Sequence, residues 1–172
     1  EDLKGTAIYK DCVKEFYKKI KRECPETVFH GNDVGHQYHT TGQRFLKYLE
    51  ENNLKDTEKY ILAKEAIEQG KYFYENSDHI YRENKMAENF IREFDKLQDE
   101  NIMGIYGSAH TDFNAMDYYN KSVPCMANQL KKRYGDAIYS ENLSYLAEDS
   151  SELSKVVDPI RVDIITINGK DY

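Results

Sequence analysis

The sequence predicts a three-layer α/β fold, in which a mainly parallel sheet of few strands is flanked by helices over a single domain of residues 1–172. The first observation is that short apolar runs typical of strands alternate with longer stretches of helical periodicity. The second is the run Ile102–Tyr106, which is closed by Gly107 and followed by polar and ionisable residues. Such a run indicates a strand buried on both faces, and open α/β sheets place their chemistry at the carboxyl ends of such strands.

Composition narrows the classes of function. The 172 residues carry a net charge of -7, 32% charged residues and a mean hydropathy of -0.83, which is typical of a soluble protein. No basic face is present, so a nucleic-acid partner is not expected. No apolar run reaches the ~20 residues that a membrane span needs. Three cysteines without a CxxC spacing favour neither a disulfide framework nor a zinc site.

The first half of the chain predicts one strand and four helices. Thr6 caps a helix with an apolar residue at every fourth position, and Pro25 ends it. A short strand, Thr27–Phe29, follows. Further helices begin at Thr41, at Asp56 and at Ser77 or Asp78, and the last of these extends to about Leu97. The apolar stripe of that last helix is formed by Met86, Phe90, Phe94 and Leu97.

The second half predicts strands at Ile102–Tyr106, Ile138–Ser140 and Ile160–Ile167, with a helix capped by Ser122 and stopped by Gly135. Asn168-Gly169 is a strong hairpin signal, yet only three residues follow it. Together with a start that has no initiator Met, this suggests an excised piece of a larger domain. We therefore expect an unpaired sheet edge or an exposed apolar face, and with it either a second copy that covers it in a homo-oligomer or poor solubility.

Parallel strands would bring two ionisable loops together. The loop after Thr27–Phe29 carries Asp33 and His36, and the loop after Ile102–Tyr106 carries His110 and Asp112. One histidine beside a carboxylate can act as a general base that activates water. Several such groups can instead bind a divalent metal, although His36-x-x-His39 matches no helical metal pair. For His30, His39 and His79 an ordinary hydrogen-bonded loop role is favoured, whereas His110 is favoured as functional.

Arg82 lies one turn before Met86, on the apolar stripe of its predicted helix. A guanidinium in that position either extends past the helix end towards solvent or points at an anion in a cleft. From the residues alone, the solvent-directed alternative is favoured.

Four segments together resemble the erythromycin-esterase-like family, within a wider group of ChaN-like and Tiki-like proteins. Phe29-His30-Gly31-Asn32-Asp33 is similar to its aromatic-x-Gly-x-Asp strand end, and the segment from Tyr81 to Asn89 resembles its Arg-(Asp/Glu)-x-x-Met-Ala-x-Asn helix. Residues 101–111 resemble its strand that ends in a small-residue turn and a histidine, although Ser108-Ala109-His110 stands where the family has Asn-x-His. Residues 134–139 resemble its Tyr-Gly-x-x-aromatic segment.

The resemblance implies the C-terminal portion of a hydrolase-like domain that acts on an ester or related acyl bond of a small-molecule substrate. It implies His110 as the catalytic imidazole, Arg82 as an oxyanion or carboxylate contact, and Asp33 with His36 as the opposite wall. The family's Gly-Glu-x-x-His-Gly motif is absent from this sequence. Three alternatives stay open: a ChaN-like haem binder, a divalent-metal binder and an inert fragment. The expected location is cytoplasmic, with an extracytoplasmic one open.

Overall fold

The computed structural model describes residues 11–97, 100–142, 166–167 and 170–171, with side chains described between residues 15 and 142. The chain forms two compact units, one of residues 1–30 and 143–172 and the other of residues 31–142. The pocket and every predicted site residue fall within the unit of residues 31–142. No helix in the described ranges is long and apolar enough to cross a membrane.

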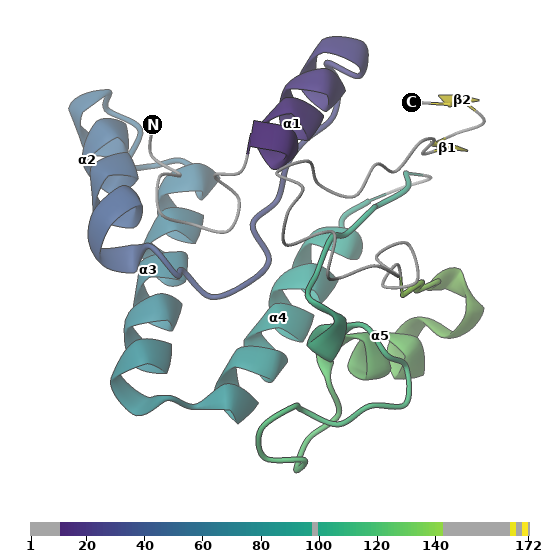
Figure 1. Cartoon of the computed structure of the whole chain (residues 1–172). Helices are drawn as coiled ribbons and strands as arrows, with labels where there is room; N and C mark the ends of the chain where they lie inside the picture. The colour runs from purple at the N-terminus through teal and green to yellow at the C-terminus, as the bar shows by residue number, and fades with distance from the viewer. Residues whose placement is uncertain (1–10, 98–99, 143–165, 168–169, 172) are drawn as a thin grey trace. The chain divides into compact units, whose positions relative to one another are not determined.

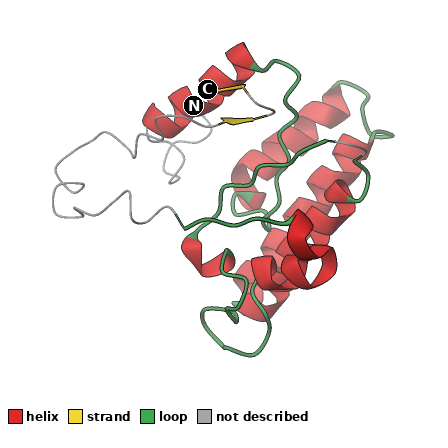
Figure 2. Ribbon diagram, turned by 90° about the vertical axis from the view of Figure 1, so that its right-hand side faces the viewer, coloured by secondary structure: helices red, strands yellow, loops and turns green. Residues whose placement is uncertain are grey.

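The prediction of an α/β fold is wrong, because the described part of the chain is helical. Figure 2 shows the helices, the loops between them and one small strand pair. The segments Thr27–Phe29, Ile102–Tyr106 and Ile138–Ser140 contain no strand. The described strands are β1 (Thr166–Ile167) and β2 (Lys170–Asp171), which pair antiparallel. A mainly parallel sheet is therefore absent from the described residues, and the shared-edge argument for the site fails.

The segment Ile102–Tyr106 shows why an apolar run misled the prediction. Its side chains at Ile102, Met103 and Ile105 are exposed, and Ile105 retains 65% of its accessible surface. Only Tyr106 packs against the core. Strand preference reflects packing against neighbouring strands, and no described strand lies alongside this segment. The run is therefore irregular chain that makes no strand hydrogen bonds with a described strand.

The unit of residues 31–142 is built on helices α2 (Gln43–Glu51), α3 (Glu58–Asn76), α4 (His79–Phe94) and α5 (Met126–Tyr134). A π-helical turn, η2 (Tyr38–Gly42), precedes α2. Figure 1 shows α3 and α4 running antiparallel about a short turn, with α5 against α4. Met86 and Ala87 of α4 and Met126 and Leu130 of α5 form the buried centre of this core.

Two of the predicted helix boundaries in this unit, at Asp78 and Gly135, rest on capping chemistry that the structure shows. The helix predicted from Thr41 begins after Gly42, and the cap of α3 is Thr57 rather than Asp56. The Asp78 carboxylate accepts the N–H of Tyr81 at the start of α4, and Thr57 caps α3 in the same way. Gly135 ends α5 with a φ of +57°, which glycine adopts without strain. The prediction for Ser122 is wrong, because α5 begins after Cys125.

Two glycines let the loop before η2 lie directly on α3. A Cβ atom at Gly70 would collide with the Gly35 carbonyl oxygen, and one at Gly35 would collide with the carbonyl oxygen of Ala66. The Gly35 N–H donates to that same Ala66 oxygen at 3.1 Å. This contact places the adjacent His36 over the face of α3 that also carries Tyr74, one turn beyond Gly70.

The other unit contains helix α1 (Asp11–Glu23), which ends two residues before Pro25. Cys24 is buried and has a free thiol. The Tyr17 ring meets the Phe29 ring edge-on, with centroids 5.3 Å apart. In the β1–β2 pair, Ile167 is opposite Lys170, and the predicted turn Asn168-Gly169 lies outside the described residues. The predicted cap at Thr6 and most of the strand Ile160–Ile167 lie outside the described residues.

Candidate functional site

A pocket of about 240 Å³ lies at the N-terminal end of α4. Two short segments complete it, the 3₁₀ turn η3 (Ser108–His110) and the loop that follows Asp117. Its lining is rich in titratable and aromatic side chains: His79, Arg82, Glu83, His110, Asp117, Tyr118 and Tyr119, together with Ala109. Polar groups that converge on one hollow are what a small-molecule site requires.

Glu83 and His110 form a close pair in this pocket. The Nδ1 atom of His110 lies 2.5 Å from Oε1 of Glu83. The other carboxylate oxygen of Glu83 accepts the N–H of Met126, the first residue of α5, at 2.9 Å. The Glu83 side chain is almost wholly buried, with 3% of the residue exposed. Both of its oxygens are thus committed, which fixes the orientation of the imidazole.

Arg82 and Asp33 form a bidentate ion pair beside that pair. Nε and Nη2 of Arg82 donate to the two carboxylate oxygens of Asp33 at 2.9 and 2.5 Å. Burial opposes ionisation of Asp33, but the hydrogen bonds from Arg82 and His36 outweigh it and hold the pKa of Asp33 well below its usual value. The hydrogen bond to Asp33 in turn raises the pKa of Arg82. The guanidinium also reaches the pocket.

His36 extends this network away from the pocket. Its Nε2 lies 2.8 Å from Oδ2 of Asp33, and its Nδ1 lies 2.6 Å from the hydroxyl oxygen of Tyr74 on α3. Neither Asp33 nor His36 lines the pocket itself. The structure therefore joins Asp33, His36 and Arg82 in one hydrogen-bonded chain, and Arg82 is the member that the chain shares with the pocket.

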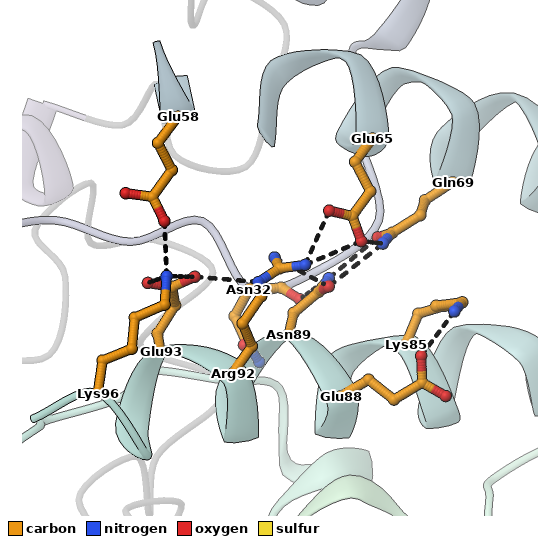
Figure 3. A network of polar contacts seen from close by, with 10 residues as sticks. All are labelled: Asn32, Glu58, Glu65, Gln69, Lys85, Glu88, Asn89, Arg92, Glu93 and Lys96. Atoms are coloured by element: carbon orange, nitrogen blue, oxygen red, sulfur yellow. Dashed lines mark hydrogen bonds and ion pairs between the residues drawn. The ribbon is translucent and has the colours of Figure 1, made fainter. Parts of the chain in front are cut away.

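A buried amide network holds the segment before Asp33 against α4 (Figure 3). The Asn89 side chain donates to the Asn32 carbonyl oxygen at 3.0 Å and exchanges two hydrogen bonds with Gln69 at 3.0 and 3.2 Å. Nη1 of Arg92 adds an ion pair with Glu65 and donates to both of its carboxylate oxygens, at 2.7 and 2.9 Å. Asn32 is therefore held to α4 directly and to α3 through Asn89 and Gln69. These contacts fix the position of the backbone next to Asp33.

The rim of the pocket is formed by a loop that Asp117 organises. The Asp117 carboxylate, which is 0% exposed, accepts the backbone N–H groups of Asn120, Ser122 and Val123 at 2.6–3.1 Å. Burial opposes ionisation, yet these backbone donors lower the pKa of Asp117 to about 2. The loop presents Tyr118 and Tyr119 to solvent.

Tyr119 covers His79, which is the first residue of α4. Their rings stack with centroids 3.6 Å apart and planes 17° apart. His79 therefore lines the pocket, where the sequence favoured an ordinary loop role. The Nζ atom of Lys121 lies 5.0 Å from the centroid of the Tyr118 ring. The exposed part of the lining is aromatic, with Tyr118 and Tyr119, while Arg82, Glu83 and His110 form its less exposed part.

Tyr106 shows how closely the core approaches the Asp33 carboxylate. Burial, together with the negative charge of Asp33, raises the pKa of Tyr106 to about 12. Tyr106 is thus a neutral phenol at physiological pH, and its ring packs against the Met86 and Leu130 core. It is the one residue of the predicted strand Ile102–Tyr106 that contributes to this core.

The four predicted site residues lie within one connected region, although no sheet edge brings them there. His110 and Arg82 line the pocket. Asp33 lies outside it and binds Arg82, and His36 in turn binds Asp33. The prediction missed Glu83, because an acid near the start of a helix ordinarily faces solvent. One signal was present, since the family pattern that this helix resembles has an acid directly after its arginine.

The donor set of the pocket does not resemble a metal centre. Within the part of the chain that the structure describes, no three His, Cys, Asp or Glu side chains are grouped as metal ligands. The carboxylate of Asp33 is bound by Arg82, and that of Asp117 by backbone N–H groups. The arrangement fits proton transfer by an oriented imidazole better than coordination of a cation.

Comparison with known proteins gives no relative: no protein-family model, no curated protein and no solved structure matches this chain.

Proposed function

We propose that this chain is a hydrolase of the erythromycin-esterase-like type, in which His110 activates water towards an ester or related acyl bond. The observation that supports the proposal is the His110–Glu83 pair in the lining of a pocket. An imidazole oriented by a buried carboxylate is the arrangement that general-base catalysis requires. The proposal rests on this pocket and on the resemblance of the Arg82–Asn89 helix, not on the overall fold.

The hydrogen bonds of Glu83 define which nitrogen of His110 is the base. An ionised carboxylate can only accept, so Nδ1 of His110 carries the proton that Glu83 binds. This leaves the lone pair on Nε2, and no described protein group hydrogen bonds to that atom. A water molecule in the pocket would give one proton to Nε2 as its oxygen forms a bond to the acyl carbon, and the buried Glu83 carboxylate would stabilise the imidazolium. The imidazolium would then give this proton to the leaving alkoxide oxygen as the C–O bond of the ester breaks, which releases the acid and the alcohol and restores the neutral imidazole.

Arg82 supplies the positive charge next to this base. Asp33 occupies its Nε and Nη2 atoms, while no described group binds Nη1. A donor on a guanidinium that is already held rigidly can stabilise the negative charge on a carbonyl oxygen without reorganising. The role of Asp33 is then to hold Arg82, and His36 holds Asp33 in turn.

The size and lining of the pocket favour a small acyl or alkoxy group. A volume of about 240 Å³ is below the usual ~300–1,000 Å³ of ligand pockets, so the pocket accommodates one end of a substrate. Tyr118 and Tyr119 at the rim offer ring faces and hydroxyl groups to the remainder of the substrate. The specific ester is a matter for screening.

The test is hydrolysis of a panel of alkyl and aryl esters by the purified protein with chelator present. Replacing His110 by Ala should lower turnover by ~10²–10⁴-fold, because that is the usual contribution of a general base. His39→Ala is the matched control, since His39 lies outside the pocket and should leave turnover unchanged. Thermal melting of each variant separates lost chemistry from lost folding.

Wild-type turnover in a folded His110→Ala variant would refute the proposal. Absence of turnover together with a Soret band on haem addition would instead support the haem-binding alternative. Turnover that requires added divalent metal would support the metal alternative. A folded protein with none of these properties would be the inert fragment.

A further inference from the structure

The Tyr74–His36–Asp33 chain lies outside the pocket, and the proposed hydrolysis does not use its outer end. We propose that the Tyr74 hydroxyl is an activated nucleophile, with His36 as its base and Asp33 as the group that orients His36. The nucleophile-to-base distance is 2.6 Å and the base-to-carboxylate distance is 2.8 Å. Both lie within the range that nucleophile, base and orienting group occupy in covalent catalysis. This inference does not depend on the hydrolase proposal.

The tautomer of His36 follows from the state of Asp33. Two hydrogen bonds from Arg82 keep Asp33 a carboxylate, which can only accept. Nε2 of His36 must therefore carry the hydrogen that points at Asp33. Nδ1 is then the acceptor, and the Tyr74 hydroxyl donates to it. The proton of Tyr74 already points at the base that would remove it.

The backbone holds this geometry rigidly. Gly35 lies in contact with Gly70, and Gly70 and Tyr74 are one turn apart on the same face of α3. His36, the neighbour of Gly35, thereby meets Tyr74 with ring centroids 5.8 Å apart. The Tyr38 ring stacks on the Tyr74 ring with centroids 5.8 Å apart, and this contact restricts the orientation of the Tyr74 ring. A nucleophile held by a loop and a helix in this way is preorganised.

Tyr74 is also accessible to a reagent, because 48% of its surface is exposed. The reaction class is transfer of an acyl or sulfonyl group from an activated donor such as an aryl ester or an aryl sulfonyl fluoride. A bond forms between the Tyr74 oxygen and the acyl carbon or the sulfur, and the bond to the leaving group breaks. The Tyr74 proton passes to Nδ1 of His36 and then to the leaving group. No oxidant or reductant is needed, and the product is an ester of Tyr74.

The experiment treats the purified protein with an aryl sulfonyl fluoride and follows each tyrosine by peptide mass spectrometry. Tyr72 is the internal control, because it lies on the same helix with 43% exposure and its ring packs on Tyr81 rather than on a histidine. Tyr74 should react at least about tenfold faster than Tyr72, since general-base assistance typically contributes ~10²-fold or more.

The His36→Ala variant should reduce the rate at Tyr74 to that at Tyr72 while Tyr72 itself is unchanged. His36→Gln is the second variant, because glutamine keeps a polar side chain at this position but is not a base. Labelling of Tyr72 in each variant, together with its melting temperature, reports whether α3 remains folded. Equal rates at Tyr74 and Tyr72 in the wild-type protein would overturn the proposal. So would a fast Tyr74 reaction that His36→Ala and His36→Gln both leave unchanged.

Discussion

Replacing Asp117 by Asn tests how the pocket rim is held. The carboxylate is fully buried and receives three backbone N–H groups, so its charge is stabilised in the folded protein and not in the unfolded chain. A pKa lowered from 3.8 to about 2 corresponds to about 2 kcal/mol, because each tenfold change in proton affinity is worth about 1.4 kcal/mol. We therefore expect Asp117→Asn to lower the free energy of unfolding by about 2 kcal/mol at pH 7.

The sign of the pH dependence is fixed by the direction of this pKa change. A carboxyl group with a lowered folded-state pKa contributes stability above its unfolded pKa, here near 3.8. That contribution falls as the pH drops from about 4 and is lost once the pH passes below about 2. The stability difference between the wild-type protein and Asp117→Asn should therefore be constant from pH 7 to pH 5 and shrink between about pH 4 and pH 2.

Urea unfolding at pH 7, 5, 4, 3 and 2.5, monitored by circular dichroism, measures this difference. Asp112→Asn is the matched control, because Asp112 is exposed on the same loop and accepts one backbone N–H, that of Asn114. It should change stability by no more than about 0.5 kcal/mol at any pH. A wild-type to Asp117→Asn difference that is the same at pH 7 and pH 2.5 would refute the assignment of the stabilisation to charge.

Three further changes test the contacts that position the site. Gly70→Ala should cost about 1–3 kcal/mol by overpacking against the Gly35 carbonyl, whereas Gly31→Ala, whose Cβ would meet nothing, should be near neutral in the same urea assay. Asn89→Ala should cost about 1–3 kcal/mol, because it removes the donor to the side-chain oxygen of the buried Gln69 and to the Asn32 carbonyl oxygen; a change below about 0.5 kcal/mol would show that water replaces Asn89. Asp33→Asn should lower the free energy of unfolding by about 2 kcal/mol at pH 7 and by progressively less as the pH falls below about 4, because the lowered pKa of Asp33 means that only its ionised carboxylate stabilises the fold. An equal cost at pH 7 and well below pH 4 would argue against the ion pair.

Some helix boundaries were predictable from the sequence, because capping is local chemistry. Asp78 starts α4 and Gly135 stops α5 through atoms within a few residues, so at these two positions the residue type carries the information. The strands were not predictable in the same way. Whether Ile102–Tyr106 becomes a strand depends on a neighbouring strand that the residue pattern does not contain. The contact between α4 and α5 instead buries Met86, Met126 and Leu130 and supplies the core.

The site was predicted in part for reasons that were wrong. The expected link between Asp33 and His110 was a shared edge of a parallel sheet, and no such sheet is described. The actual link runs along α4, where Arg82 binds Asp33 and its neighbour Glu83 binds His110. Side chains at adjacent positions on a helix point about 100° apart. Arg82 and Glu83 of α4 can therefore bind two different loops, one that carries Asp33 and one that carries His110. A single sequence does not reveal which loops those are.

The acids around the pocket share a property that determines what the site can do. Asp33 is neutralised by Arg82, Glu83 is bound to His110 and to the first N–H of α5, and Asp117 is saturated by backbone donors. Each carboxylate thus holds another group in place, and its oxygens have few lone pairs left to bind a cation or to accept a proton from a substrate. A cation that entered the pocket would have to break one of these contacts, and breaking a buried charged hydrogen bond costs about 1.5–3 kcal/mol. Among the described residues, Nε2 of His110 and Nη1 of Arg82 are left without a hydrogen-bond partner, and both side chains line the pocket. In the proposed hydrolysis the first would be the base and the second the positively charged donor.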